Sequence, residues 1–155
     1  MTDTSIEIPD HVRTVRLRQR VDAEPYRVFR AWESPDALST WFPDSVEGSL
    51  AVGARSTLVF PSRRVWCDVL QVQPDVQFRF RWPWLDNDEL VTTVTVTVTP
   101  RGYGSVVTLE DGPFDLTVPG VVDAYADCLS GWGEALANLR AVIDFSVDLR
   151  RYRSG

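Results

Sequence analysis

The chain has 155 residues, of which 44% are hydrophobic and 25% are charged, and its formal net charge is −6. These values are typical of one globular domain with a core of its own. The negative charge disfavours nucleic acid as a partner, and no apolar run is long enough to span a membrane. Residues 1–10 lack the apolar segment of a signal peptide, so the cytoplasm is the expected location.

A strand and two short helices are predicted at the start of the domain. Residues 12–21 alternate between apolar and arginine side chains, which predicts a strand with one buried face. Pro25 then opens a short helix. Ser34 and Pro35 begin a second helix, because serine caps a helix and proline suits its first turn.

Six further strands are predicted before the end of the chain. They cover residues 44–50, 55–60, 64–73, 76–82, 89–99 and 105–111, and turns rich in proline and glycine separate them. Short strands at regular spacing with such turns indicate a meandering antiparallel sheet. Gly112 and Pro113 are expected to end the last strand and lead the chain toward a helix.

A long helix is predicted over residues 118–147, with Pro119 in its first turn. Its apolar face recurs at steps of three and four and comprises Val121, Tyr125, Cys128, Trp132, Leu136, Leu139 and Ile143. Gly131 and Gly133 interrupt this helix, although an interior glycine costs about 1 kcal/mol relative to alanine. Either a neighbour packs too closely for a side chain there, or room is left beside Trp132.

These elements predict an α+β domain over residues 12–147. A curved antiparallel sheet of about seven strands wraps around the long helix, because a sheet of this size curls and both surfaces carry an uncovered apolar face. Residues 1–11 are expected to form a flexible tail, and residues 148–155 a second tail at the carboxyl end.

Three stretches of the sequence resemble one known superfamily. The residues from Val21-x-Ala23-x-Pro25 to Trp41-Phe42 are similar to the opening of the SRPBCC superfamily, which has the START-type, birch-allergen-like helix-grip fold. Residues 69–74, with Phe78-x-Phe80-x-Trp82, resemble the central hairpin of the branch named after the heat-shock-protein ATPase activator C-terminal domain. Gly131-Trp132 and the leucines that follow resemble its terminal helix. The resemblance implies a deep apolar cavity between the sheet and that helix, which the superfamily uses for many purposes.

Few residues could support catalysis. His11, the only histidine, lies at the edge of the predicted tail, which excludes a multi-histidine metal site and a Ser–His–Asp triad in the domain. No metal and no cofactor is therefore expected. Cys67 and Cys128 are predicted to be free thiols, and Cys128 to be a small buried apolar residue rather than a nucleophile.

Carboxylates on the strands are the remaining catalytic candidates. Asp68 would lie in the cavity with a raised pKa if its face of the strand points inward, but the alternation equally allows the face of Val65, Cys67 and Val69 to do so. Glu110 and Asp111 lie on opposite faces, which would place one of them at the cavity mouth unless that strand end is solvated. Asp68 and Glu110 are the two candidates for a general base.

Aromatic residues give the stronger signal. They could pack only against one another, or several could line a pocket, since ligand sites are mostly apolar with a few placed polar groups. Tyr125, Thr92 and Gln19 could supply such groups. The residues predicted to line a ligand site are Trp32, Trp41, Trp66, Phe78, Phe80, Trp82, Thr92, Phe114, Tyr125, Cys128 and Trp132.

Three functions are compatible with this sequence. The favoured one is non-enzymatic binding of a small hydrophobic or aromatic molecule in the cavity. The second is a polyketide cyclase or dehydratase-like enzyme that uses Asp68 or Glu110. The third, a chaperone-interaction module, is implied by the family name; it is disfavoured because the chain lacks the N-terminal domain of the eukaryotic activators and shows no obvious exposed apolar patch. The sequence leaves a homodimer open.

Overall fold

The computed structural model describes residues 9–85 and 88–152. The parts of the predicted tails and loop that fall on residues 1–8, 86–87 and 153–155 lie outside the described residues. The elements in chain order are β1 (Val12–Val21), α1 (Pro25–Glu33), α2 (Pro35–Ser39), β2 (Ser45–Glu47), β3 (Arg55–Val59), β4 (Arg64–Gln73), β5 (Gln77–Pro83), β6 (Val91–Arg101), β7 (Gly104–Asp115), α3 (Val121–Phe145) and the 3₁₀ helix η2 (Leu149–Tyr152). This order confirms the predicted α+β helix-grip architecture.

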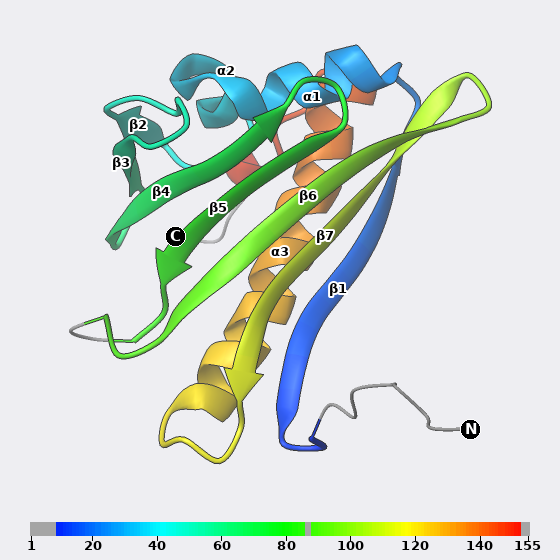
Figure 1. Ribbon diagram of the computed structural model, residues 1–155. Helices are drawn as coiled ribbons and strands as arrows, with labels where there is room; N and C mark the ends of the chain where they lie inside the picture. The colour runs from blue at the N-terminus through cyan, green and yellow to red at the C-terminus, as the bar shows by residue number, and fades with distance from the viewer. Residues whose placement is uncertain (1–8, 86–87, 153–155) are drawn as a thin grey trace, which may run out of the picture.

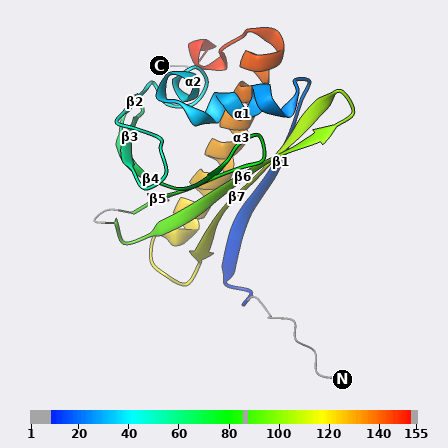
Figure 2. The same ribbon diagram turned by 45° about the horizontal axis from the view of Figure 1, so that its top comes forward.

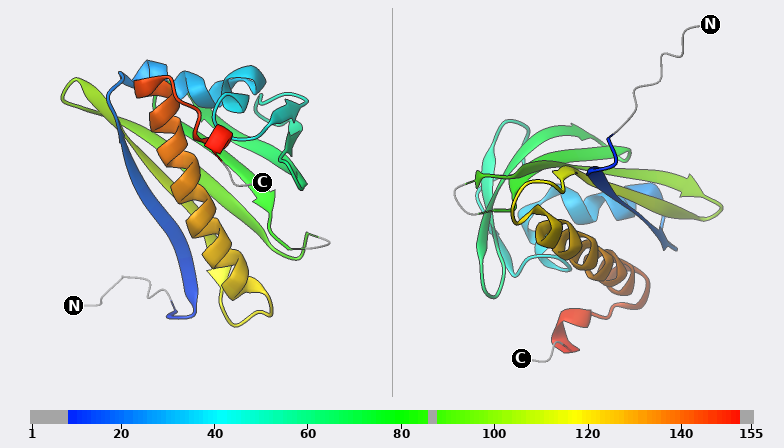
Figure 3. Two further views of the ribbon diagram at one scale, coloured as in Figure 1. Left: turned by 180° about the vertical axis from the view of Figure 1, so that it is seen from behind. Right: turned by 90° about the horizontal axis from the view of Figure 1, so that it is seen from below.

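The seven strands form one antiparallel sheet in the order β1-β7-β6-β5-β4-β3-β2 (Figure 1). The first strand therefore pairs with the last, and β1 and β2 are the two edges. The sheet curves around α3, as the view from below shows (Figure 3). Alternation sets the inner face: on β5, for example, Phe78, Phe80 and Trp82 are buried while the arginines between them face the other way.

The two short helices lie across one end of the sheet, near the carboxyl-terminal end of α3 (Figure 2). The hydroxyl oxygen of Ser34 accepts a hydrogen bond from the backbone N–H of Ala37 at 3.2 Å, which confirms the predicted cap. Val28, Phe29 and Trp32 of α1 are buried against the sheet and α3. The tandem helices thus close the end of the core.

The prediction that Gly112 and Pro113 end the last strand is wrong. β7 continues to Asp115, and β1 pairs with it across a bulge: Val15 lies opposite Asp111, but Arg13 lies opposite Phe114. A Cβ on Gly112 would lie 2.9 Å from the hydroxyl oxygen of Thr14 and 3.1 Å from its Cα, so a larger residue here would require β1 to shift. The extra residue in β7 resets the alternation, and both Asp111 and Phe114 point inward.

The long helix begins three residues later than predicted. Gly120 caps it with φ 83°, a left-handed conformation that favours glycine, so Pro119 lies outside the first turn. The predicted apolar face is confirmed, with Cys128, Trp132 and Leu139 among its buried residues. α3 contacts β1 and β7, and Figure 3 shows it running along that side of the sheet. None of the described helices is both long and apolar enough to cross a membrane.

Candidate functional site

A pocket of about 660 Å³ opens between α3 and the β3–β5 side of the sheet. α3 contacts β1 and β7, so the pocket lies beside this helix, and the carboxyl-terminal segment contributes to its lining. Residues from five stretches of the chain line it: Trp41, Phe42, Phe60, Ser62, Arg63, Trp82, Trp84, Asp127, Cys128, Gly131, Trp132, Glu134, Ala135, Ala137, Asn138, Leu149, Arg150 and Tyr152. Its volume falls in the range of sites for small organic molecules.

The interior directly beneath α3 is filled. Trp132 lies at the centre of an aromatic cluster, with ring centroids 4.7 Å from Phe42, 5.2 Å from Trp82 and 6.2 Å from Trp32. A second cavity, lined by Trp32, Phe78 and Phe80 among others, measures only about 10 Å³, at most the size of one water molecule. The rings therefore pack together in the core, and those at its edge form the wall of the open pocket.

Four tryptophans line the pocket, and all four donate their indole N–H to the protein itself. Trp41 donates to the carbonyl oxygen of Ala31 at 2.8 Å. Trp82 and Trp132 donate to Oδ2 of Asp111 at 3.1 and 3.0 Å. Trp84 donates to the hydroxyl oxygen of Thr92 at 2.9 Å. These four tryptophans consequently present ring surfaces to the pocket, while their N–H donors are bonded within the protein.

Asp111 lies behind this wall as a fully buried carboxylate. Besides the two indoles, Thr92 donates its hydroxyl to Oδ1, and the Cys128 thiol donates to Oδ2 at 3.2 Å. In residues 9–85 and 88–152 no basic side chain pairs with it. Burial raises the pKa of Asp111, and the four neutral donors act against that rise.

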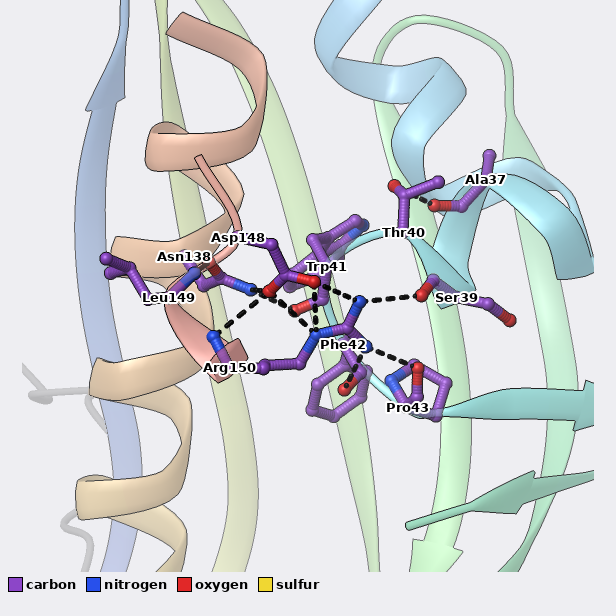
Figure 4. Close-up of polar contacts among 10 residues, drawn as sticks. All are labelled: Ala37, Ser39, Thr40, Trp41, Phe42, Pro43, Asn138, Asp148, Leu149 and Arg150. Carbon is purple, nitrogen blue, oxygen red and sulfur yellow. Dashed lines mark hydrogen bonds and ion pairs between the residues drawn. The ribbon is translucent and has the colours of Figure 1, made fainter. Parts of the chain in front are cut away.

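The carboxyl-terminal segment contributes Leu149, Arg150 and Tyr152 to the lining of the pocket, and Figure 4 shows the polar contacts that hold it in place. Asn138 of α3 donates to the carbonyl oxygen of Trp41 at 2.8 Å and to Asp148 at 3.1 Å, and its own carbonyl oxygen accepts from the backbone N–H of Leu149 at 2.6 Å. One buried amide thus joins α3, the end of α2 and the start of η2. It fixes Leu149 at the pocket.

Arg150 completes this contact. Its guanidinium donates to the carbonyl oxygens of Ser39 at 3.0 Å and Pro43 at 2.7 Å, and to Oδ2 of Asp148 at 2.9 Å (Figure 4). Hydrogen bonds from Arg150 hold the pKa of Asp148 at about 2. We call the group Asn138, Asp148, Leu149 and Arg150 the carboxyl-terminal clasp. No periodic pattern predicts this clasp, because Asn138 and Arg150 bond backbone carbonyls of residues 39–43, far away in the chain.

The two predicted general bases lie outside the pocket. Asp68 is on the outer face of β4, where Arg55 and Arg81 pair with it at 2.7 and 3.1 Å and lower its pKa, Arg55 foremost. The inward face of β4 is the alternative set, Val65, Cys67 and Val69. Glu110 also faces outward, 3.5 Å from Arg16. Placing Asp68 or Glu110 in the cavity was therefore wrong.

The residues predicted to bind ligand lie in the pocket wall, in the filled core and on the outer face of the sheet. Trp41, Trp82, Cys128 and Trp132 line the pocket, and Thr92 lies behind it through its contacts with Trp84 and Asp111. Trp32, Phe78 and Phe80 belong to the filled core, and Phe114 packs between Trp84 and Tyr125. Trp66 lies on the outer face under Arg55, and Gln19 bonds its neighbour's carbonyl on β1.

Of the two glycines within α3, Gly131 lies at the pocket and Gly133 lies away from it. Both are exposed, and a Cβ on either would meet nothing within 4 Å, which rules out a close neighbour as the reason for glycine. Gly131 lines the pocket next to Trp132, whereas Gly133 does not. The alternative that room is left beside Trp132 therefore fits Gly131.

Sequence reasoning placed either Glu110 or Asp111 at the cavity but took Glu110 as the candidate base, and it missed much of the pocket rim; the inward residue is Asp111. Asp111 shares the parity of Val107 and Leu109, which the strand buries, so counting back along β7 would have placed it inward. Trp84 and Arg63 lie outside regular strands, where no periodicity indicates direction. In the described ranges, no three His, Cys, Asp or Glu side chains gather as a metal-binding group.

Comparison with known proteins identifies the fold and the family. Protein MLL2253 from Mesorhizobium loti is 25% identical, with a TM-score of 0.76 over 87% of this chain and 99% of that one. The Aha1 dimer from Colwellia psychrerythraea is 16% identical, with a TM-score of 0.75 over 85% and 96%. DynU16, from the dynemicin biosynthetic locus, is 23% identical, with a TM-score of 0.75 over 89% of this chain and 49% of that one.

No curated protein matched the sequence. The family model described as "Activator of Hsp90 ATPase homolog 1-like protein" matches residues 22–144, from the end of β1 almost to the end of α3. The match spans most of the chain and agrees with the resemblance noted in the sequence. The chain therefore belongs to the Activator of Hsp90 ATPase homolog 1-like family, within the SRPBCC superfamily.

Proposed function

We propose that this protein binds a small, planar, apolar molecule in the 660 Å³ pocket and does not transform it. The observation that carries the proposal is the wall of four tryptophans whose N–H groups are already bonded inside the protein. Such a wall offers large flat apolar surfaces and asks for no hydrogen-bond acceptor from the ligand. Phe42 and Phe60 extend it toward the β3–β4 turn.

The pocket is preformed. The carboxyl-terminal clasp fixes one side, and the hydrogen bonds to Asp111 fix the orientation of Trp82 and Trp132 on the other. A site whose side chains are already ordered loses less conformational entropy on binding. These contacts support a binding role for the pocket.

An enzymatic role has less support. Asp68 and Glu110 face the solvent side of the sheet, and Asp111 accepts hydrogen bonds from buried donors. Burial and the neighbouring Asp111 raise the pKa of the Cys128 thiol, which disfavours a thiolate nucleophile. Binding to a chaperone, which the family's description suggests, stays a prediction that co-purification would test.

The test is a thermal-shift screen of small aromatic molecules, followed by calorimetric titration of those that act. A ligand at a hundred times its Kd stabilises the folded state by about 2.7 kcal/mol, which should raise Tm by roughly 5–10 °C for a chain of this size. Tryptophan fluorescence should change in parallel, because four indoles line the pocket.

Gly131→Leu and Gly133→Leu form a matched pair for this test. Both substitutions lie in α3, and both replace a helix-interior glycine whose Cβ would meet open space, so both should preserve or slightly raise stability. Only the side chain at Gly131 would enter the pocket. We expect Gly131→Leu to abolish binding and Gly133→Leu to leave it unchanged; equal binding by both variants, or a screen without any shift, would contradict the proposal.

A further inference from the structure

The chemistry of the pocket also indicates which charge its ligand carries. We propose that the pocket selects planar aromatic cations over neutral or anionic aromatic molecules of the same size, an inference that rests on the proposed function above. Two independent features support it: what the indole rings present to the pocket, and which charged groups surround it.

The rings present electron-rich surfaces. The face of an indole carries negative electrostatic potential and attracts cations, with an energy of about 0.5–2 kcal/mol depending on exposure. Trp82 and Trp132 each donate their N–H to the Asp111 carboxylate, and hydrogen bonds in such a chain polarise one another, so electron density moves toward the rings. The positive edge of each indole is directed into the protein, away from the ligand.

The protein already places a cation on one of these rings. The guanidinium carbon of Arg63 lies 5.8 Å from the centroid of Trp84, at the rim of the pocket. An organic cation could make the same kind of contact with the neighbouring rings. Among the described lining residues, Arg63 and Arg150 are the cations whose charge must be weighed against the acidic groups.

Among the described residues, the carboxylates at the pocket outnumber the basic groups that have no acidic partner. Asp127 and Glu134 line the pocket from α3, two helical turns apart, and no described basic side chain pairs with either. Asp111 adds a third carboxylate behind the wall. Arg150 is balanced by Asp148 and bonds backbone carbonyls, which leaves three carboxylates against the guanidinium of Arg63.

The experiment compares three probes of nearly equal size and shape by calorimetric titration at mildly alkaline pH: N-methylquinolinium, neutral quinoline and anionic 1-naphthoate. N-methylquinolinium should bind about tenfold more tightly than quinoline, the equivalent of one cation–aromatic contact, and 1-naphthoate should bind more weakly than both. Added salt should weaken binding of the cation and leave quinoline almost unaffected.

Charge variants test the role of the rim. Asp127→Asn should weaken binding of N-methylquinolinium several-fold more than binding of quinoline, because only the cation is attracted by the lost charge. Asp123→Asn is the matched control, because Asp123 is an exposed residue of the same helix that does not line the pocket. Arg63→Gln should strengthen binding of the cation.

Two outcomes distinguish a failure of the charge selectivity from a failure of the proposed binding function. If quinoline or 1-naphthoate binds at least as tightly as the cation, and Gly131→Leu abolishes that binding, then the charge selectivity is wrong and the binding function stands. If no probe shows binding that depends on Gly131, the proposed function fails for these ligands and the selectivity fails with it.

Discussion

Two carboxylates on opposite faces of the sheet are held in contrasting ways. Asp68 lies on the outer face between Arg55 and Arg81, both charged and both half-exposed. Asp111 lies on the inner face among two indoles, a hydroxyl and a thiol, all neutral and all buried. The first is an ordinary surface ion network, whereas the second is a buried charge stabilised only by hydrogen bonds.

This difference indicates which of the two carboxylates the stability of the fold depends on. When a surface carboxylate is removed, water solvates its arginine partners, so the free energy of unfolding changes little. Removing the buried one leaves several donors without an acceptor, and each buried unsatisfied donor costs about 1–3 kcal/mol. Asp111 should therefore matter far more for stability than Asp68, although only Asp68 pairs with opposite charges.

The largest expected effect is that of Asp111→Ala. It should lower the free energy of unfolding by about 3 kcal/mol or more, because the N–H groups of Trp82 and Trp132 lose their acceptor. Asp68→Ala, the matched surface variant, should cost less than about 1 kcal/mol. Urea denaturation measures both, and equal losses would show that the two carboxylates are held in the same way after all.

Thr92→Val should have the next largest effect. The substitution conserves shape but removes the hydroxyl that donates to Asp111 and accepts from Trp84, so we expect a loss of about 1–3 kcal/mol. Thr97→Val is a suitable control on the same strand, since Thr97 is only half-buried and bonds Gln77 at 3.3 Å. If the control cost as much as Thr92→Val, the buried network would not be the cause.

The two carboxylates should also act oppositely on stability as a function of pH. The pKa of Asp68 is lowered by folding, so its stabilising contribution is present above the unfolded pKa and is lost as pH falls below it. The pKa of Asp111 is raised by folding, so protonation on acidification adds stability. Asp68→Asn should therefore flatten the acid limb of the stability curve, and Asp111→Asn should steepen it.

Urea titrations at a series of pH values from neutral down to about 2 measure these slopes, because the unfolded pKa of an aspartate is about 3.9. Asp148, with its pKa near 2, contributes a further loss at lower pH, and Asp148→Asn removes that contribution. A flatter acid limb in Asp111→Asn than in the wild type would mean that folding lowers the pKa of this carboxyl instead of raising it.

The smallest effect should be seen at the two cysteines. Burial raises the pKa of Cys67 to about 12, and burial together with Asp111 raises the pKa of Cys128. Neither thiol should react with iodoacetamide in the folded protein, while both should be labelled in urea, as mass spectrometry would show. Rapid labelling of Cys128 alone would indicate that the pocket gives access to the Asp111 network.

The fold could be predicted because each of its main elements has a strong local pattern. The strand over Gln77–Pro83 alternates cleanly, and the faces of α3 recur at helical spacing. Which face of β4 points inward could not be predicted in the same way, because Trp66 and Leu70 on one face are as apolar as Val65 and Val69 on the other. Asp68 of β4 faces outward because it pairs there with Arg55 of β3 and Arg81 of β5, and this pairing depends on two other strands.

The site could be predicted only in part. Trp82, Cys128 and Trp132 belong to regular elements whose patterns point them inward, and they line the pocket. Asp111 precedes a Gly-Pro pair, which locally suggests a strand end, yet pairing with β1 carries the strand onward through a bulge. Such long-range pairing leaves no trace in a window of neighbouring residues.

The carboxyl-terminal clasp has a practical consequence for handling the protein. Leu149, Arg150 and Tyr152 line the pocket, so an affinity tag or fusion partner appended beyond them would start at the rim of the very surface that a binding assay is meant to sample. The amino end enters the fold at β1, the edge of the sheet opposite β2. An affinity tag is therefore better placed at the amino terminus, and a fluorescent reporter of ligand binding is better placed at the carboxyl terminus.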